Sequence, residues 1–390
     1  MVTNFSLIRT PRILFGSGEA DRISTLISPG WKHILILTGS KSHENNPVFE
    51  TIHKDLEKTG IRLGFEKIEN EPSPKDIDNI ARNSIYHDVD AVIAIGGGSV
   101  LDAGKAVSAM IPLNDSVLNY LEGVGHSKHP GTKKFFIAIP TTSGTGSEAT
   151  SNAVLSQTGI NGFKRSLRHE SFVPDIALVD PRLTINCPPS ITARSGMDAF
   201  TQLLESYVSV KSNSLTDAFA LDGIRCVHKS LMRAFTNGDD LEARTDMAYA
   251  ALLSGITLAN AGLGLIHGFA SSVGGFFEIP HGTVCGTMMG VVNRYNIKAL
   301  LKQTEQTVSH RKYAETGKVL SGEAGKSIEW YLNFTANYID ELTEKLLLKR
   351  LSEFGIQKED IGRIAEVTDH KANPVKFQKE DLVDMLKIRL

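Results

Sequence analysis

The chain has 390 residues, of which 41% are hydrophobic and 22% are charged, and its formal net charge is −2. This length favours two domains of ordinary size. The near-neutral balance argues against a nucleic acid or an anionic membrane as a partner, and no run of about 18 apolar residues predicts a membrane span. The three cysteines, Cys187, Cys226 and Cys285, are widely separated and match no cysteine-based zinc spacing. They form no disulfide framework, so we expect a cytoplasmic protein.

Short apolar runs alternate with polar, helix-like stretches through the first half of the chain. The pattern predicts strands at 12–15, 33–38, 61–65, 91–95, 135–140 and 176–180, and helices at 50–58 and 76–84. Strand, helix and strand at this spacing indicate a mostly parallel sheet that is covered on both faces. We therefore expect a Rossmann-like α/β domain that binds a dinucleotide over residues 1–186.

The second half differs in composition and hydrophobic pattern and is expected to be entirely helical. Stretches rich in Ala, Leu and Ser run through 198–210, 216–235, 242–261 and 266–273, and no convincing strand interrupts them. The segment Cys187-Pro188-Pro189 is the expected link, because proline stops regular structure. This assigns residues 187–390 to a helical domain that carries the metal and the substrate.

The most informative segment is Gly96-Gly97-Gly98-Ser99-Val100-Leu101-Asp102, which lies between the apolar run 91–95 and a helical pattern. Glycines let the backbone turn tightly and approach an anion. The free N–H groups at the start of the helix would then face that anion. The pattern predicts a phosphate site, and the alternative is a tight turn without a ligand.

A second glycine-rich segment, 140–148, directly follows a predicted strand. It holds five hydroxyl side chains and two glycines in nine residues, which suits a ligand rich in ribose and phosphate oxygens. Taken alone, it would equally suit a polar surface loop. Two such loops at the carboxyl ends of strands favour one shared ligand in an open α/β sheet.

The end of the strand 33–38 bears on the choice between the two nicotinamide dinucleotides. A carboxylate often stands at such a position to hold the ribose 2′-OH. Here the strand ends in Gly39-Ser40-Lys41. A lysine there would tolerate or pair with a 2′-phosphate, which favours NADP over NAD. Alternatively, Lys41 is only a solvated lysine.

Four polar residues of the second half are candidate ligands of a divalent cation. Asp198 and Gln202 are four residues apart in a predicted helix and share one face. His267 lies in another helical stretch, and His281 stands at the start of a further helix. Imidazole and carboxylate suit zinc or iron(II). The alternative is that these histidines are hydrogen-bonded core residues.

These segments together resemble the iron-containing, or group III, alcohol dehydrogenase family. The resemblance spans nearly the whole chain and rests on five motifs in the family's order. They are GGGSxxD at 96–102, PTTxGTGSE at 140–148, VPDxAxxDPxL at 173–183, GMDA at 196–199, and His267 with the segment 279–282.

The resemblance implies a dehydroquinate synthase-like architecture and reversible hydride transfer between NAD(P)(H) and a small alcohol or aldehyde. It implies a cation, Fe(II) or Zn(II), held by Asp198, Gln202, His267 and His281, with Asp198, His267 and His281 as the catalytic residues. It also implies a homodimer or a larger homo-oligomer. The residues that it assigns to the cofactor are Gly39, Ser40, Lys41, Gly97, Gly98, Ser99, Asp102, Thr141, Thr142, Thr145, Ser147, Lys164 and Leu183.

Two positions depart from the family pattern. Gln202 stands where the family usually has a histidine, and Ser271 replaces a histidine near the substrate. A glutamine ligates only through a neutral oxygen, so three ligands and an open position are one possibility.

Three other classes stay open at this point. They are a metal-independent reductase similar to the maleylacetate reductases, a lyase of the dehydroquinate-synthase type, and a cofactor-binding relative without redox activity. A basic cluster, Lys164, Arg165, Arg168 and His169, leaves an anionic substrate as a further alternative.

Overall fold

The computed structural model describes residues 4–40, 46–159 and 162–390, so the predicted cofactor residue Lys41 lies outside the described residues. Six strands form one sheet in the order β1-β8-β5-β4-β2-β3. Every neighbouring pair in this sheet is parallel. The strands are β1(Arg12–Phe15), β2(His33–Gly39), β3(Arg62–Ile68), β4(Ala91–Gly96), β5(Phe135–Pro140) and β8(Ile176–Val179).

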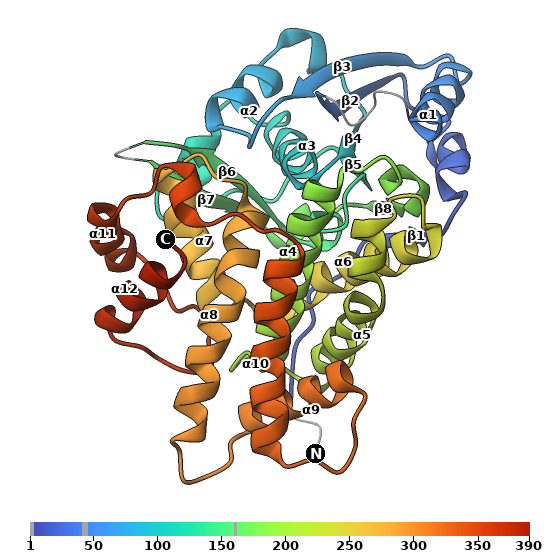
Figure 1. Cartoon of the computed structure of the whole chain (residues 1–390). Helices are drawn as coiled ribbons and strands as arrows, with labels where there is room; N and C mark the ends of the chain where they lie inside the picture. The colour runs from blue at the N-terminus through green and yellow to red at the C-terminus, as the bar shows by residue number, and fades with distance from the viewer. Residues whose placement is uncertain (1–3, 41–45, 160–161) are drawn as a thin grey trace.

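The sheet is buried on both faces, as its continuous apolar strands predict. In β2, Ile34 and Ile36 point to the face covered by α1(Pro47–Glu57) and η1(Glu19–Leu26). Leu35 and Leu37 point to the opposite face, which packs against α2(Pro74–Ala81) and α3(Gly98–Met110). The predicted α/β fold class is thereby confirmed, and Figure 1 shows these helices around the sheet.

The structure also contains a hairpin that the sequence analysis did not predict. Strands β6(Asn152–Gln157) and β7(Phe163–Arg168) pair antiparallel and form a second, two-stranded sheet. Its strands mix polar and charged residues without the long apolar runs of the main sheet, which explains the omission. The remaining short helices of this half are η2(Ser84–Tyr86), η3(Val117–Tyr120), η4(Ser147–Ala149), η5(Glu170–Phe172) and η6(Pro181–Thr184).

Beyond Val179, the part of the chain that the structure describes contains only helices. After the short helix η6, the first α-helix begins at Pro189, the last residue of the predicted link at 187–189. The helices are α4(Pro189–Val208), α5(Ser214–Thr236), α6(Leu241–Ala261), α7(Leu265–Phe276), α8(His281–Leu301), α9(Val308–Ser321), α10(Ile328–Lys345), η7(Leu351–Phe354), η8(Lys358–Asp360), α11(Ile361–Glu366) and α12(Lys379–Ile388). They share one large apolar core, whereas the sheet has its own cores.

Close backbone packing joins the two halves. Gly146 has a left-handed φ of 62°, and a Cβ there would lie 2.4 Å from the backbone nitrogen of Gly255 in α6. No side chain fits this contact, so the loop after β5 rests directly on α6. At the other end, the N–H of Ile8 donates to Asn260 Oδ1 of α6. The predicted division at residues 186 and 187 falls between η6 and α4 and stays a prediction.

A helix that spans a membrane needs about 20 residues of mostly apolar character. None of the helices in the described ranges meets that requirement by itself. The pair α6 and α7 meets it only when the two are taken together across a bend of 97°.

Candidate active site

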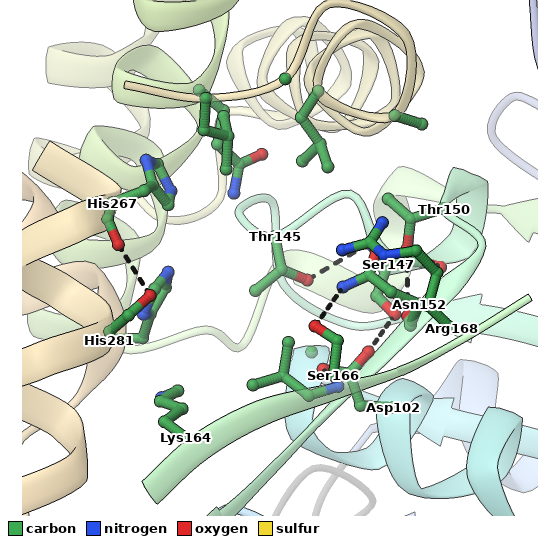
Figure 2. A pocket seen from close by; sticks show the side chains of 18 of the residues that line it. Asp102, Thr145, Ser147, Thr150, Asn152, Lys164, Ser166, Arg168, His267 and His281 are labelled. Atoms are coloured by element: carbon green, nitrogen blue, oxygen red, sulfur yellow. Dashed lines mark hydrogen bonds between the residues drawn. The ribbon is translucent and has the colours of Figure 1, made fainter. Parts of the chain in front are cut away.

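A cavity of about 800 Å³ lies between the sheet half and the helical half. The sheet half contributes the start of α3, the loop after β5 and the hairpin, and the helical half contributes α4, α6, α7 and α8. Figure 2 shows His267 and His281 on one side of it, opposite Asp102, Ser147 and Arg168. The predicted site residues that line it are Gly98, Ser99, Asp102, Thr145, Ser147, Lys164, Gln202, His267 and His281.

The triple-glycine turn forms the floor of the cavity on the sheet side. Strand β4 ends at Gly96, and α3 begins at Gly98, with Gly97 as an N-cap that has no side chain to cap the helix. A Cβ on Gly98 would lie 2.4 Å from the Thr145 side chain. The two glycine-rich loops are therefore in contact, as their strand-end positions predicted. The N–H groups of the first helical turn have the geometry that suits an anion.

A buried polar network holds the second loop in place. Ser147 Oγ donates to Asp102 Oδ1 at 2.6 Å, and the N–H of Val154 donates to the other carboxylate oxygen at 3.1 Å. Burial raises the pKa of Asp102. Lys105, which the sequence analysis did not select, donates from Nζ to Ser147 O at 2.9 Å and to Asn152 O at 2.7 Å. Asp102 and Lys105, both on α3, thus hold the loop after β5 through their contacts with Ser147.

The other described residues that were predicted to bind the cofactor are not among the residues that line the cavity. Thr142 lies beside Gly97, and Thr141 is buried. Gly39 ends β2, and Ser40 follows it. Leu183 is 3% exposed and packs in the apolar cluster under the sheet. Their roles toward a cofactor stay predictions.

The predicted cofactor residue Lys164 lies on β7 and reaches the cavity wall. Its Nζ forms an ion pair of 2.5 Å with Glu71, whose other oxygen accepts from Ser156 Oγ. Two further members of the basic cluster also have partners. Arg168 pairs with Glu122 at 2.8 Å, and His169 Nδ1 lies 2.8 Å from Ser171 Oγ. Glu71 and Glu122 thus offset the charges of Lys164 and Arg168, two of the residues on which the anionic-substrate alternative depends.

Three helices bring the predicted cation ligands together. Asp198 comes from α4, His267 from α7 and His281 from the first position of α8. Asp198 Oδ1 lies 3.4 Å from His267 Nε2 and 3.9 Å from His281 Nε2. This oxygen is buried and has no hydrogen-bond partner among the described residues. A buried carboxylate oxygen without a partner is costly, and a cation would relieve that cost.

The electrostatics of the three side chains differ. Burial and the charge of Lys164 lower the pKa of His281 to about 3, so its imidazole is neutral and able to ligate. Burial alone would lower the pKa of His267, but the charge of Glu205 and the contact with Asp198 raise it well above its usual range. Burial would likewise raise the pKa of Asp198, whereas the contact with His267 holds it below its ordinary value. A cation that binds here must displace the proton of His267.

Glu205 and Cys285 belong to this cluster, and the sequence analysis missed both. Glu205 Oε2 accepts from His267 Nδ1 at 2.6 Å, which turns Nε2 toward Asp198. Cys285 Sγ lies 3.6 Å from the Nε2 atoms of both histidines. The spacing His281-x-x-x-Cys285 on one helix face was the available signal. Spacings between cysteines alone do not carry this signal.

The two departures from the family pattern have defined positions. Gln202 lines the cavity, and its Oε1 accepts a hydrogen bond from Ser254 Oγ at 2.7 Å. Ser271 also lines the cavity, but its hydroxyl donates to the carbonyl of His267 at 2.8 Å within its own helix. The hydroxyl, which is the only polar group of the Ser271 side chain, is therefore already engaged within α7.

Comparison with known proteins identifies the class that this fold and site define. The family model for iron-containing alcohol dehydrogenase matches residues 10–181, and the model for the C-terminal part of the same family matches residues 192–390. The chain belongs to this family. The predicted class, an oxidoreductase of the alcohol dehydrogenase type, is confirmed.

Individual relatives match this chain over nearly its full length. The chain is 32% identical to alcohol dehydrogenase 4 of Saccharomyces cerevisiae over 99% of this chain and 98% of the relative. It is 29% identical to the NAD-dependent methanol dehydrogenase of Bacillus methanolicus over 99% of both chains. Among solved structures, the alcohol dehydrogenase from Oenococcus oeni aligns with a TM-score of 0.86 and 29% identity, covering 99% of this chain and all of that chain.

Proposed function

We propose that this protein catalyses reversible hydride transfer between a nicotinamide dinucleotide and a small alcohol or aldehyde in the cavity between its two halves. One observation carries the proposal. Gly98 and Ser99 of the glycine turn line the same cavity as His267 and His281. The ligand atom of Asp198 lies within 4.8 Å of those of the two histidines. A dinucleotide on the turn would therefore extend toward the ligand group.

The chain's own residues contribute position and charge. Gly97, Gly98 and Ser99 would bind the pyrophosphate at the start of α3, where no side chain caps the helix. Thr145 and Ser147 would line the cofactor from the adjacent loop, which Asp102 orients. These residues hold the nicotinamide against the substrate, and the nicotinamide supplies the redox chemistry.

Asp198, His267 and His281 fit a divalent cation by their donor types and by the unpartnered carboxylate oxygen. When bound, the cation supplies Lewis-acid stabilisation of charge on the substrate oxygen. Glu205 keeps His267 in the orientation that ligation needs, because it accepts the Nδ1 proton.

For the dinucleotide, we propose NADP(H) rather than NAD(H). The support is the end of β2, where Gly39 stands in place of a carboxylate that would repel a 2′-phosphate. The Gly39→Asp variant tests this. We expect kcat/KM for NADPH to fall and that for NADH to hold or rise, and a wild type that prefers NADH would overturn the proposal.

The central experiment combines activity with metal analysis. Protein purified without chelator is assayed against a panel of small alcohols and aldehydes with both dinucleotides, following the absorbance of reduced nicotinamide. We expect turnover that falls when the cation is removed and returns when it is restored. Full activity in metal-free protein would instead support the reductase that needs no metal. Tight dinucleotide binding without turnover across the panel would support the non-redox relative.

We also propose a cytoplasmic homo-oligomer. Cys187, Cys226 and Cys285 are all free thiols, which suits a reducing compartment. Oligomers of identical chains are the common form of enzymes of this kind. Light scattering coupled to size exclusion tests the oligomeric state, and a monomer at micromolar concentration would contradict it.

A further inference from the structure

Two residues compete for the fourth place around the Asp198, His267 and His281 group. Gln202 occupies the position that the family pattern assigns to a ligand, while Cys285 occupies a position that the pattern does not use. We propose that Cys285, not Gln202, supplies the fourth protein donor, so that the site is an Asp-His-His-Cys centre of the kind that zinc prefers. This inference rests on the cation site of the proposed function.

The geometry of the four donor atoms is the first argument. Asp198 Oδ1, the two Nε2 atoms and Cys285 Sγ all lie within 4.8 Å of one another. Zinc bonds of about 2.3 Å to sulfur and about 2.0–2.1 Å to nitrogen and oxygen would set tetrahedral edges of about 3.6 Å for S···N and about 3.4 Å for N···O. The observed S···N separations are both 3.6 Å. The His267 to Asp198 separation is 3.4 Å, and only the His281 to Asp198 separation, 3.9 Å, is longer.

The second argument is that the oxygen of Gln202 is already engaged. Gln202 Oε1 accepts from Ser254 Oγ at 2.7 Å, and the same hydroxyl lies 3.4 Å from the carbonyl oxygen of Gly144 in the loop after β5. Gln202 thus links α4 through α6 to the loop that lines the cofactor side. Turning its oxygen toward the histidines would break this contact, and Ser254 Oγ would keep the carbonyl oxygen of Ala251, 2.8 Å away, as its acceptor.

The third argument is charge in a buried place. Asp198 and His267 are 2% and 3% exposed, and Cys285 is fully buried. A carboxylate and a thiolate are two anionic ligands for a divalent cation, whereas the amide of Gln202 is a neutral one. The buried carboxylate of Glu205 adds a negative charge behind His267, 2.6 Å from its Nδ1. Thiolate also favours zinc over the harder iron(II) ion.

Two features of the site make Cys285 more than a lone buried cysteine. Asp198 Oδ1 is a buried oxygen that points at the same centre and has no hydrogen-bond partner among the described residues. His281 and Cys285 lie one turn apart on α8, so their side chains reach that centre from the same helix face.

Cobalt(II) is the probe for this proposal, because a thiolate bound to cobalt(II) gives a charge-transfer band in the near ultraviolet. We expect the cobalt-loaded wild type to show this band and Cys285→Ser to lose it while keeping the visible ligand-field bands. Gln202→Leu should keep the band. Cys226→Ser, which removes a thiol on α5, is the matched control and should also keep it.

Affinity gives a second measure. Chelator competition should show that Cys285→Ser binds zinc at least about tenfold more weakly than wild type, beyond the effect of Gln202→Leu. The preference for zinc over iron(II) should shrink in the same variant. Near-ultraviolet circular dichroism of the metal-free variants checks that each one folds.

The proposal fails if cobalt-loaded wild type lacks the charge-transfer band, a result that needs no variant to fold. It also fails if the band survives in Cys285→Ser, or if Gln202→Leu loses more affinity than Cys285→Ser. None of these readouts requires turnover. A wild type that shows the band but reduces no aldehyde would refute the proposed function and leave the ligand set supported.

Discussion

The two walls of the cavity are built by opposite means. On the sheet side, backbone atoms form the surface at the start of α3, because Gly97 and Gly98 have no side chains. Thr145 of the neighbouring loop packs against Gly98. On the helical side, side chains form the surface, and the candidate cation ligands among them come from three helices. We therefore expect glycine substitutions to act through steric exclusion on the first wall. On the second wall, ligand substitutions should act through chemistry, with the fold intact.

The sharpest test of this contrast is Asp198→Ala. We expect cation content to fall to background and kcat to fall by about a thousandfold, because Lewis-acid stabilisation is worth several kcal/mol. The unfolding free energy of the metal-free protein should fall modestly with the fold intact, because the variant removes the buried carboxylate whose Oδ1 lies 3.4 Å from Nε2 of the protonated His267. Elemental analysis, steady-state kinetics and denaturant unfolding measure these three quantities.

The control for that variant is Asp384→Ala, which removes an exposed carboxylate on α12 that pairs with Lys387. It should leave cation content and kcat unchanged. Wild-type kcat in Asp198→Ala would show that the helical wall does not act through a cation.

Glu205→Gln should have the next largest effect. Glu205 accepts from both His267 Nδ1 and the N–H of Ile266, and a glutamine has only one oxygen for these two donors. Loss of such a partner typically weakens cation affinity by about 10–100-fold. Chelator competition measures this, and Glu341→Gln, an exposed change on α10, is the control. Unchanged affinity would mean that Glu205 has no orienting role.

Gly98→Ala tests the backbone wall. A Cβ at this position would lie 2.4 Å from the Thr145 side chain, so the loops must separate. We expect the Kd for dinucleotide to rise about tenfold or more and stability to fall by about 1–3 kcal/mol, while cation content stays at the wild-type level. Gly362→Ala, where nothing lies within 4 Å, is the matched control. Coupled loss of the cation in Gly98→Ala would break the distinction between the two walls.

The smallest effect concerns a buried carboxyl between the walls. Burial raises the pKa of Glu148 to about 7, above its ordinary value of 4.5. The folded state therefore binds the extra proton between pH 4.5 and 7, so stability falls as pH rises through that window. Glu148→Gln should remove this fall and gain about 1–3 kcal/mol over wild type at pH 8, with little difference at pH 5. Urea unfolding at the two pH values tests this, and Glu170→Gln, an exposed change, is the control.

Most elements of the sheet side could be predicted from local sequence patterns. The run 91–95 followed by three glycines predicted a strand, a bare turn and a helix, and β4 and α3 follow that order. Continuous apolar runs in β2, β4 and β5 predicted a sheet buried on both faces. The hairpin β6 and β7 was not predicted because its strands are held by pairing with each other and by packing on α3 and α7, and their few apolar residues stand among polar and charged ones.

The helical side could be predicted only in part. Residue types indicated that Asp198, His267 and His281 could share a cation, and the resemblance supported them. Neither indicated that Cys285 would point at the same centre or that Gln202 would turn to Ser254. The positions of these side chains depend on how α4, α6, α7 and α8 cross, which no local spacing records.

The amino-acid order thus settles most of the elements of this protein and its triple-glycine turn, because strand, turn and helix propensities act over a few neighbouring residues. The packing of distant helices settles which donors meet. Asp198 and Cys285 are far apart in the chain, and only the shared apolar core of the helical half brings their atoms within bonding reach of one ion.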